Sequence, residues 1–184
     1  MMSDAAHARP ARRLFFALWP DTESRSAAAA RVAALVPPGQ GRPQRPDQLH
    51  VTLVFLGQVA EPSLDHVHAV AAGITGTAFT LILDRLEHWR KPGVLCLTTS
   101  AVPAPLASLV EQLRTALAAQ RLPSESRPYR PHLTLARKLA RFEGPAELEP
   151  LPWRAASITL VESRSHREGS RYEPLASWPL DAER

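Results

Sequence analysis

The chain contains one cysteine, Cys96, among its 184 residues, so it cannot form an internal disulfide. A lone cysteine also excludes a zinc site of the Cys-x-x-Cys type, and it fits a reduced, cytoplasmic setting. Lysine is scarce, because only Lys91 and Lys138 stand among the 22 basic residues. The others are arginine, whose planar guanidinium suits bidentate contacts with phosphate. A net charge of +4 indicates tolerance of anionic ligands rather than coverage of long DNA.

The sequence also lacks a long apolar run. No stretch approaches the roughly 20 apolar residues that a membrane helix needs. The run LFFALW near the N-terminus ends at Pro20 and is too short for the core of a signal peptide. With 45% hydrophobic and 22% charged residues, the composition is that of a soluble globular protein. We therefore expect a soluble, cytoplasmic monomer with no membrane segment and a single bilobal domain over residues 1–184, of which residues 1–11 are flexible.

One strand–helix–strand pattern occurs twice in the chain. Residues 13–57 begin with the strand RLFFALWP, continue with an alanine-rich helical segment and a Pro/Gly loop, and end in the strand LHVTLVFLG. Residues 93–139 repeat this order, from GVLCLTTS through a helical segment with periodic leucines and a Pro-rich loop to HLTLARKL. Each repeat carries a histidine, His50 or His132, at the matching point of its last strand.

Each repeat is followed by further elements. Residues 63–74 are expected to form a helix, residues 78–89 a strand, residues 143–152 a connector and residues 158–178 a hairpin. The predicted fold class is α+β, with two pseudo-symmetric lobes around a central cleft. Each lobe would be a mainly antiparallel sheet with helices packed outside, and the hairpin could pair with either sheet.

The two histidines each belong to an H-x-T-L motif. Because side chains alternate along a strand, His50 and Thr52 share one face, and His132 and Thr134 share the matching face. The apolar residues between them point to the opposite, buried face. A single such pair is usually only a packing feature, and duplication alone could preserve one. Two copies at equivalent positions of a repeat favour a functional role.

These motifs resemble those of the two-histidine (2H) phosphoesterase superfamily. The opening RLFFALWP and the closing ES…RYEPL…WPL are similar to its bacterial RNA 2′,3′-cyclic phosphodiesterase branch, also called 2′-5′ RNA ligase. The resemblance spans about residues 12 to 180. It implies an enzyme that hydrolyses RNA 2′,3′-cyclic phosphate ends or nucleotide 2′,3′-cyclic phosphates, with no cofactor and no metal.

Opening a cyclic phosphate with water requires a base on one side of the phosphorus and an acid on the other. Two imidazoles with pKa values near 6.5 suit both roles at neutral pH. The hydroxyls of Thr52 and Thr134 would donate hydrogen bonds to the phosphate oxygens. The resemblance implies that His50 protonates the leaving O3′ and that His132 accepts a proton from water, which leaves a 2′-phosphate. The residues alone leave the reverse assignment open.

Arg137 is a further candidate, because the resemblance implies an arginine on the phosphate five residues after the second histidine. Strand alternation disagrees, since an odd offset from His132 points to the opposite face. Arg137 reaches the phosphate only if the strand ends or bulges near Ala136.

Three further candidates are weaker, because their residue types more often have a structural role. Phe16 and Tyr172 could stack on a base or pack in the core and the hairpin. Arg130 could steer phosphate or stay solvated in its loop.

Three alternative functions remain open from the sequence. The same fold could join RNA ends by a 2′-5′ bond, it could bind nucleotides or RNA without catalysis, or it could use the histidines as metal ligands. No acidic residue accompanies either motif at ligand spacing, which disfavours the metal site. The natural substrate also stays open among tRNA fragments, oligonucleotides, mononucleotides and other cyclic phosphates.

Overall fold

The computed structural model describes residues 11–36, 38–145, 148–167 and 169–182. Ala11 already belongs to the first strand, and the rest of the segment expected to be flexible lies outside the described residues. The elements in chain order are β1 (Ala11–Leu18), α1 (Thr22–Leu35), β2 (Arg42–Pro43), η1 (Pro46–Gln48), β3 (Val51–Ala60), η2 (Glu61–Ser63), α2 (Leu64–Ala72), β4 (Phe79–Leu83), β5 (Arg85–Trp89), β6 (Val94–Thr98), α3 (Ala104–Ala119), β7 (His132–Arg137), β8 (Leu151–Ala155), β9 (Ser157–His166) and β10 (Gly169–Pro179).

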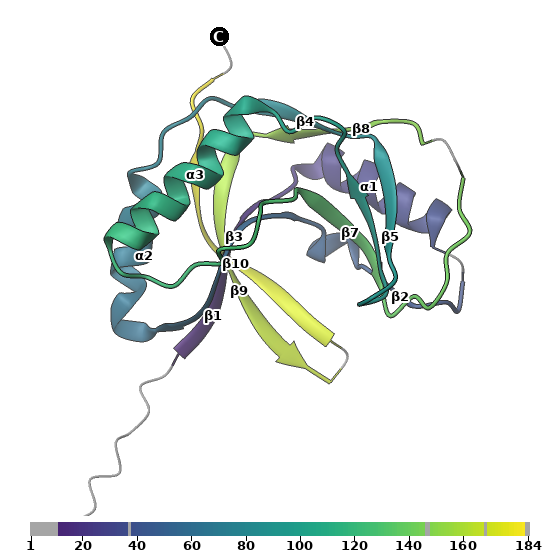
Figure 1. The fold of residues 1–184 in the computed structure, drawn as a ribbon, viewed down its shortest axis with the longest axis horizontal. Coiled ribbons are helices and arrows are strands. Elements are labelled where there is room, and N and C mark those ends of the chain that lie inside the picture. Colours follow the sequence, from purple (N-terminus) through teal and green to yellow (C-terminus); the bar gives the residue numbers. More distant parts are fainter. Residues whose placement is uncertain (1–10, 37, 146–147, 168, 183–184) are drawn as a thin grey trace, which may run out of the picture.

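Within the described residues, eight strands form one sheet and two strands form another. The large sheet runs β10-β9-β1-β3-β7-β6-β5, with β2 beside β7, and β4 pairs with β8 (Figure 1). Every strand pair in both sheets is antiparallel, which confirms the predicted α+β class with mainly antiparallel sheets. The two halves of the large sheet are not separate, because Val51 of β3 pairs with Leu133 of β7. That single pair is the join between the lobes.

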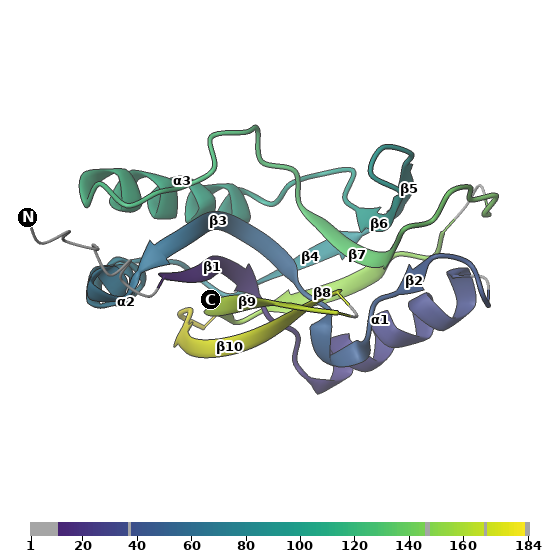
Figure 2. The ribbon, with the colours of Figure 1, turned by 90° about the horizontal axis from the view of Figure 1, so that it is seen from below.

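Helices α1 and α3 each pack on the half of the molecule opposite to the strand that precedes them in sequence. Helix α1 follows β1 in sequence but packs near β7 and β8, whereas α3 follows β6 but packs near β3. Figures 1 and 2 show α2 and α3 together at one end of the molecule and α1 at the other. The hairpin of β9 and β10 pairs with β1, one of its two expected positions. Each lobe therefore contains segments from both ends of the chain.

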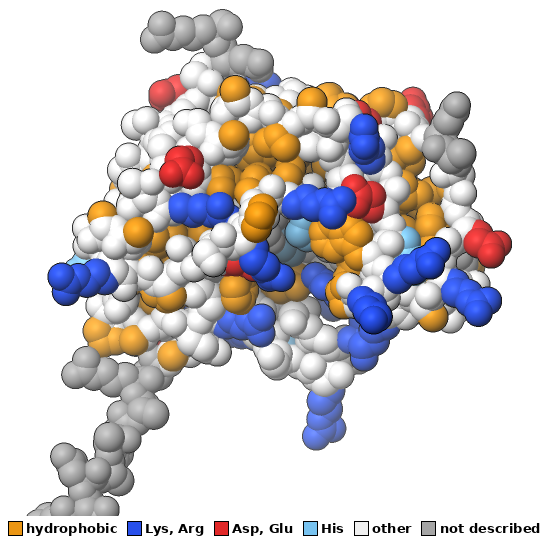
Figure 3. Space-filling model, in the orientation of Figure 1, with side chains coloured by type: hydrophobic (Ala, Val, Ile, Leu, Met, Phe, Trp, Pro, Cys, Tyr) orange, Lys and Arg blue, Asp and Glu red, His pale blue; other side chains and the backbone are white. Residues whose placement is uncertain are grey.

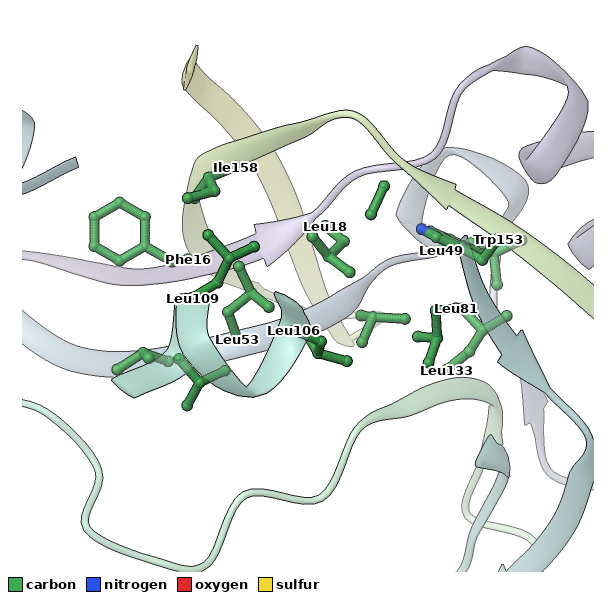
Figure 4. Close-up of a cluster of buried hydrophobic side chains, with 14 of the residues drawn as sticks. Phe16, Leu18, Leu49, Leu53, Leu81, Leu106, Leu109, Leu133, Trp153 and Ile158 are labelled. Carbon is green, nitrogen blue, oxygen red and sulfur yellow. The ribbon is translucent and has the colours of Figure 1, made fainter. Parts of the chain in front are cut away.

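The hydrophobic core lies on the face of the large sheet that α3 covers. Leu106 and Leu109 of α3 lie close to Phe16 and Leu18 of β1 and to Leu53 of β3 (Figure 4). All five side chains are buried. The leucines of α3 recur at helical spacing, which explains why the sequence predicts this helix.

Two predicted elements differ from the structure. Residues 78–89 form two strands, because the chain turns at Asp84, whose carboxylate accepts hydrogen bonds from the backbone N–H and the hydroxyl of Ser100. The predicted connector at residues 143–152 runs into β8, where Leu151 and Trp153 are buried against β4. Pro152 between them disguised the strand pattern. In the described part of the chain, no helix is long and apolar enough to cross a membrane.

Candidate active site

The join between β3 and β7 brings the two H-x-T-L motifs together. Val51 and Leu133 form the residue pair that joins these strands, and both are buried on the core side. Antiparallel register, extended by one residue, places His50 opposite Thr134 and Thr52 opposite His132. Because side chains alternate, these four residues lie on the opposite face of the sheet from the core.

A cavity of about 620 Å³ opens on this face, lined by both halves of the molecule. His50, Thr52 and His132 line it together with Arg137. Figure 3 shows Lys and Arg side chains gathered around a hollow in which histidine is visible. The cationic residues lining the cavity are Arg13, Arg42, Arg45, Arg127, Arg137 and Lys138. Glu125 is the acidic residue in the described lining, so the cavity suits an anionic ligand.

Both imidazoles are oriented by the same backbone contact. Nδ1 of His50 lies 2.8 Å from the carbonyl oxygen of Gln48, and Nδ1 of His132 lies 2.9 Å from the carbonyl oxygen of Arg130. A carbonyl oxygen only accepts hydrogen bonds, so Nδ1 of each ring carries the proton. Nε2 of each ring is then left to exchange a proton with a ligand.

Aromatic side chains surround His50. Its ring stacks on Trp19 at 5.6 Å between centroids, and it lies 5.0 Å from Phe15 and 4.8 Å from Tyr172. This burial lowers the pKa of His50 to about 4, although the bond to the Gln48 carbonyl acts in the opposite direction. The positive charges of His132 and Arg137 lower it further. The free protein therefore holds His50 neutral at pH 7.

A more polar group of residues surrounds His132. Its ring lies 4.8 Å from that of Trp89, and the guanidinium of Arg130 lies 5.2 Å from the same indole. Burial lowers the pKa of His132, and Arg137 and Arg130 add to this effect. The bond to the Arg130 carbonyl and the carboxylate of Glu87 oppose them by stabilising the positive charge. The two histidines thus have different electrostatic surroundings.

The position of Arg137 depends on a bulge in β7. Leu135 is an extra residue in the ladder, because the residues on either side of it pair with the adjacent Leu95 and Cys96 of β6. A bulge resets side-chain alternation, so Arg137 lies on the side of His132 and lines the cavity. The structure therefore contains the bulge near Ala136 that Arg137 needs in order to reach the cavity.

The comparisons with known proteins agree with this geometry. The sequence matches the 2′-5′ RNA ligase superfamily over residues 19–167. The chain belongs to this superfamily. The RNA 2′,3′-cyclic phosphodiesterase of Escherichia coli (strain K12) is 34% identical over 174 residues, which cover 92% of this chain and 97% of that protein. The protein of the same name from Thermus thermophilus is 29% identical over 181 residues, covering 93% of this chain and 91% of that protein. A crystal structure of E. coli LigT complexed with 3′-AMP has a TM-score of 0.83 and 32% identity, covering 93% of this chain and 99% of that one.

One prediction for this member of the 2′-5′ RNA ligase superfamily is wrong by a single residue. Phe16 is fully buried and packs on Trp178, on the core side of the sheet. Ala17 pairs with Thr52, so the neighbours of Ala17 point away from the cavity and Phe15, two residues before it, points toward it. Phe15, not Phe16, therefore lies beside His50, and Phe16 has the core role that the sequence gave as its alternative.

Tyr172 lies where the sequence placed it as a candidate, in the cavity wall beside His50. Gln48 holds it there. The side chain of Gln48 accepts a hydrogen bond from the backbone N–H of Tyr172 at 2.5 Å and donates one to its carbonyl oxygen at 3.3 Å. Sequence reasoning missed this link, because it joins residues 124 positions apart.

Arg130 does not point into the main cavity. Its side chain pairs with Glu87 and lines a smaller neighbouring cavity of about 300 Å³. The structure thus does not support the role in phosphate steering that the sequence offered. Thr134 lies on the same face of β7 as His132, but it is only 7% exposed and is not among the residues that line the cavity.

Sequence reasoning also missed Trp19 and Trp89, each of which packs against one histidine. A signal was present, because each tryptophan stands at or just after the end of a strand. In the described part of the chain, no three His, Cys, Asp or Glu side chains gather in a group that could hold a metal ion.

Proposed function

We propose that this chain hydrolyses RNA 2′,3′-cyclic phosphate ends to 2′-phosphate ends, with two histidines as general acid and base and without a metal. The observation that carries the proposal is the pairing of Val51 with Leu133, which brings both H-x-T-L motifs onto one face beside a cationic cavity. Relatives that cover nearly the whole chain bear the name of this activity. A crystal structure of E. coli LigT complexed with 3′-AMP supports the binding of a nucleotide in this cavity.

In the proposed mechanism the phosphate lies between the two imidazoles. Nε2 of His132 takes a proton from water as the water oxygen attacks phosphorus. The P–O3′ bond breaks, and Nε2–H of His50 gives its proton to O3′. The 2′-oxygen keeps the phosphate, so the product is a 2′-phosphate and a free 3′-hydroxyl.

Binding groups complete the site. Thr52 and Arg137 line the cavity, and we assign them to the non-bridging phosphate oxygens. We assign Thr134 to the same oxygens, because it lies on the same face of the sheet, although it is buried in the free protein. Phe15 and Tyr172 lie beside His50 and offer faces for the base or ribose. The negative phosphate raises the pKa of His50 on binding, and the donor is thereby protonated in the complex.

The low pKa of His50 in the free protein is compatible with its role as the donor. An imidazolium with a low pKa is a strong acid, so it transfers its proton readily to a leaving alkoxide. His132, in contrast, has Glu87 nearby to stabilise the charge that it gains. The reverse assignment would give a 3′-phosphate instead, and the product distinguishes the two.

Ligation is the second candidate function, because the superfamily carries the name of that activity. A 5′-hydroxyl would replace water as the attacking group, and the same acid and base would act. We expect hydrolysis to dominate, since water is in large excess. Assays with tRNA half-molecules alongside cyclic-phosphate RNA would measure the two activities together.

The test uses an oligoribonucleotide ending in a 2′,3′-cyclic phosphate, with a strong chelator present. We expect conversion to a 2′-phosphate end, identified by NMR of the product. His50→Asn and His132→Asn should each lower kcat by about 10²- to 10⁴-fold, the usual contribution of general acid–base catalysis. The affinity for product should change little, which separates catalysis from simple binding.

His66→Asn is the matched control, because His66 is exposed on α2, away from the cavity. It should retain full turnover. Turnover that disappears with the chelator would contradict a metal-independent reaction. Full turnover in both active-site variants would refute the two-histidine mechanism.

A further inference from the structure

The ladders around the two histidines can be compared position by position. In the His132 half, Thr134 pairs with Cys96 of β6, which in turn pairs with Glu87 of β5. Paired residues share a face of the sheet, so Glu87 lies on the face of the histidine. It is two strands away from the motif.

The His50 half has the same arrangement. Thr52 pairs with Ala17 of β1, which pairs with Thr159 of β9. The residue that corresponds to Glu87 is therefore Thr159. Thr159 is buried, and its hydroxyl shares a hydrogen bond of 2.8 Å with Ser177. One half has a carboxylate where the other has a neutral hydroxyl.

Three donors converge on the Glu87 carboxylate. It accepts hydrogen bonds from Nε1 of Trp89 and from the hydroxyl of Thr98, both at 2.8 Å, and from the guanidinium of Arg130. Trp89 and Arg130 are the residues that contact His132, one through its ring and the other through its backbone carbonyl. Thr98 pairs with His132 in the ladder. Each of these three neighbours of the His132 ring is thus hydrogen-bonded to the same carboxylate, that of Glu87.

The charged groups that face His132 do not all act in the same direction. Arg130 on the preceding loop and Arg137 at the end of β7 both disfavour its protonated form. His50 across the join carries a second titratable ring. The backbone carbonyl of Arg130 favours the protonated form through its bond to Nδ1, and Glu87 is the charged group that acts in the same direction. Glu87 also neutralises Arg130.

We propose that Glu87 is a positioning residue that makes His132 the proton acceptor of the pair. Its negative charge stabilises the imidazolium that forms when His132 takes the proton from water. Its hydrogen bonds hold Trp89 and the Arg130 loop against the ring. The difference between Glu87 and Thr159 then breaks the symmetry of a duplicated site. This assignment rests on the proposed function.

The test replaces Glu87 with Gln, which keeps the shape and removes the charge. We expect kcat for the cyclic phosphate to fall by about 10- to 100-fold with KM nearly unchanged, by analogy with the loss of an outer partner of a metal-ligating histidine. NMR titration of the His132 ring, without substrate, should show a lower pKa than in the wild type. Glu111→Gln, which removes a carboxylate from the exposed side of α3, is the control and should change neither readout.

Two more variants separate charge from packing. Glu87→Asp retains the carboxylate and should recover most of kcat and the His132 titration. In Glu87→Gln with Arg130→Gln, both members of the ion pair are neutral, so the pKa of His132 should return toward the wild-type value.

An unchanged His132 titration in Glu87→Gln would overturn the assignment, and so would an Asp variant as impaired as the Gln variant. The titration needs no substrate. Failure of the wild type to open the cyclic phosphate would therefore count against the proposed function alone.

Discussion

Each imidazole of the site is held by the backbone carbonyl two residues before it, Gln48 for His50 and Arg130 for His132. The two rings therefore have the same tautomer, and their chemical difference comes from the surroundings. Phe15, Trp19 and Tyr172 enclose His50 in apolar surface, whereas a carboxylate lies near His132. Burial opposes the charged form, so both pKa values fall below the ordinary value of 6.5.

These pKa values predict an acidic optimum for kcat/KM. Catalysis requires one ring protonated and the other neutral, and kcat/KM reports the free enzyme. Above about pH 6.5 both rings are neutral, so kcat/KM should fall about tenfold for each further pH unit, and below about pH 4, the pKa of His50, both are charged. Measurement from pH 4 to pH 8 at constant ionic strength tests this. A value of kcat/KM that keeps rising to pH 8 would contradict the expected protonation states.

At the scale of single elements, one bulge and one strand pairing determine which side chains face the cavity. The bulge in β7 turns Arg137 into the cavity, and the pairing of Ala17 with Thr52 places Phe15 rather than Phe16 on the side of His50. Such bulges change side-chain direction without changing the apolar pattern of a strand. Regular alternation, applied to the sequence, therefore places Arg137 on the face opposite to His132, where the bulge does not leave it.

The end of α3 offers a test of stability away from the site. The N–H of Arg121 bonds to the carbonyl of Ala118, and the N–H of Leu122 bonds to that of Leu117, which is the Schellman pattern. Arg121 takes the position that glycine usually holds, with φ of 55°. Arg121→Gly should raise the free energy of unfolding by about 1 kcal/mol, because a side chain disfavours this conformation. Urea denaturation measures the change.

A matched substitution controls for the flexibility that glycine adds. Ala118→Gly lies one turn earlier, at an exposed helical position. It should lower the free energy of unfolding by about 0.5 to 1 kcal/mol. Loss of stability in both variants would argue against strain at Arg121.

At the scale of the whole molecule, the two lobes are interlocked. Helix α1 packs on the half opposite to the strand that precedes it, and so does α3. The C-terminal hairpin completes the half that begins at the N-terminus, by pairing β9 with β1. Neither lobe can be formed from one continuous half of the sequence.

Because each lobe is built from both halves of the sequence, we expect a single cooperative unfolding transition. Separation of the lobes would expose the faces of α1 and α3 that are buried in the fold, so neither lobe is stable alone. Tryptophan fluorescence reports on all four tryptophans, which include Trp19 in one half and Trp89 in the other. Far-UV circular dichroism reports on the helices. Their urea midpoints should coincide. Two separated midpoints would show that the lobes unfold independently.

Much of this protein follows from its sequence alone. The repeat, the helical spacing of α3 and the paired H-x-T-L motifs predict an antiparallel α+β fold and identify His50, Thr52, His132 and Thr134 as site candidates. Periodicity reports which face of a strand or helix is buried, because burial repeats with the backbone period. Periodicity did not predict strand β8, because Pro152 interrupts its apolar pattern.

Only the tertiary structure decided how the two motifs meet and what surrounds them. The single pair of Val51 and Leu133, the bulge before Arg137 and the attachment of Glu87 to the His132 side all depend on strand register. Register joins residues that are far apart in sequence, and no local pattern records it. The electrostatic difference between two copies of one motif therefore arises from their long-range neighbours.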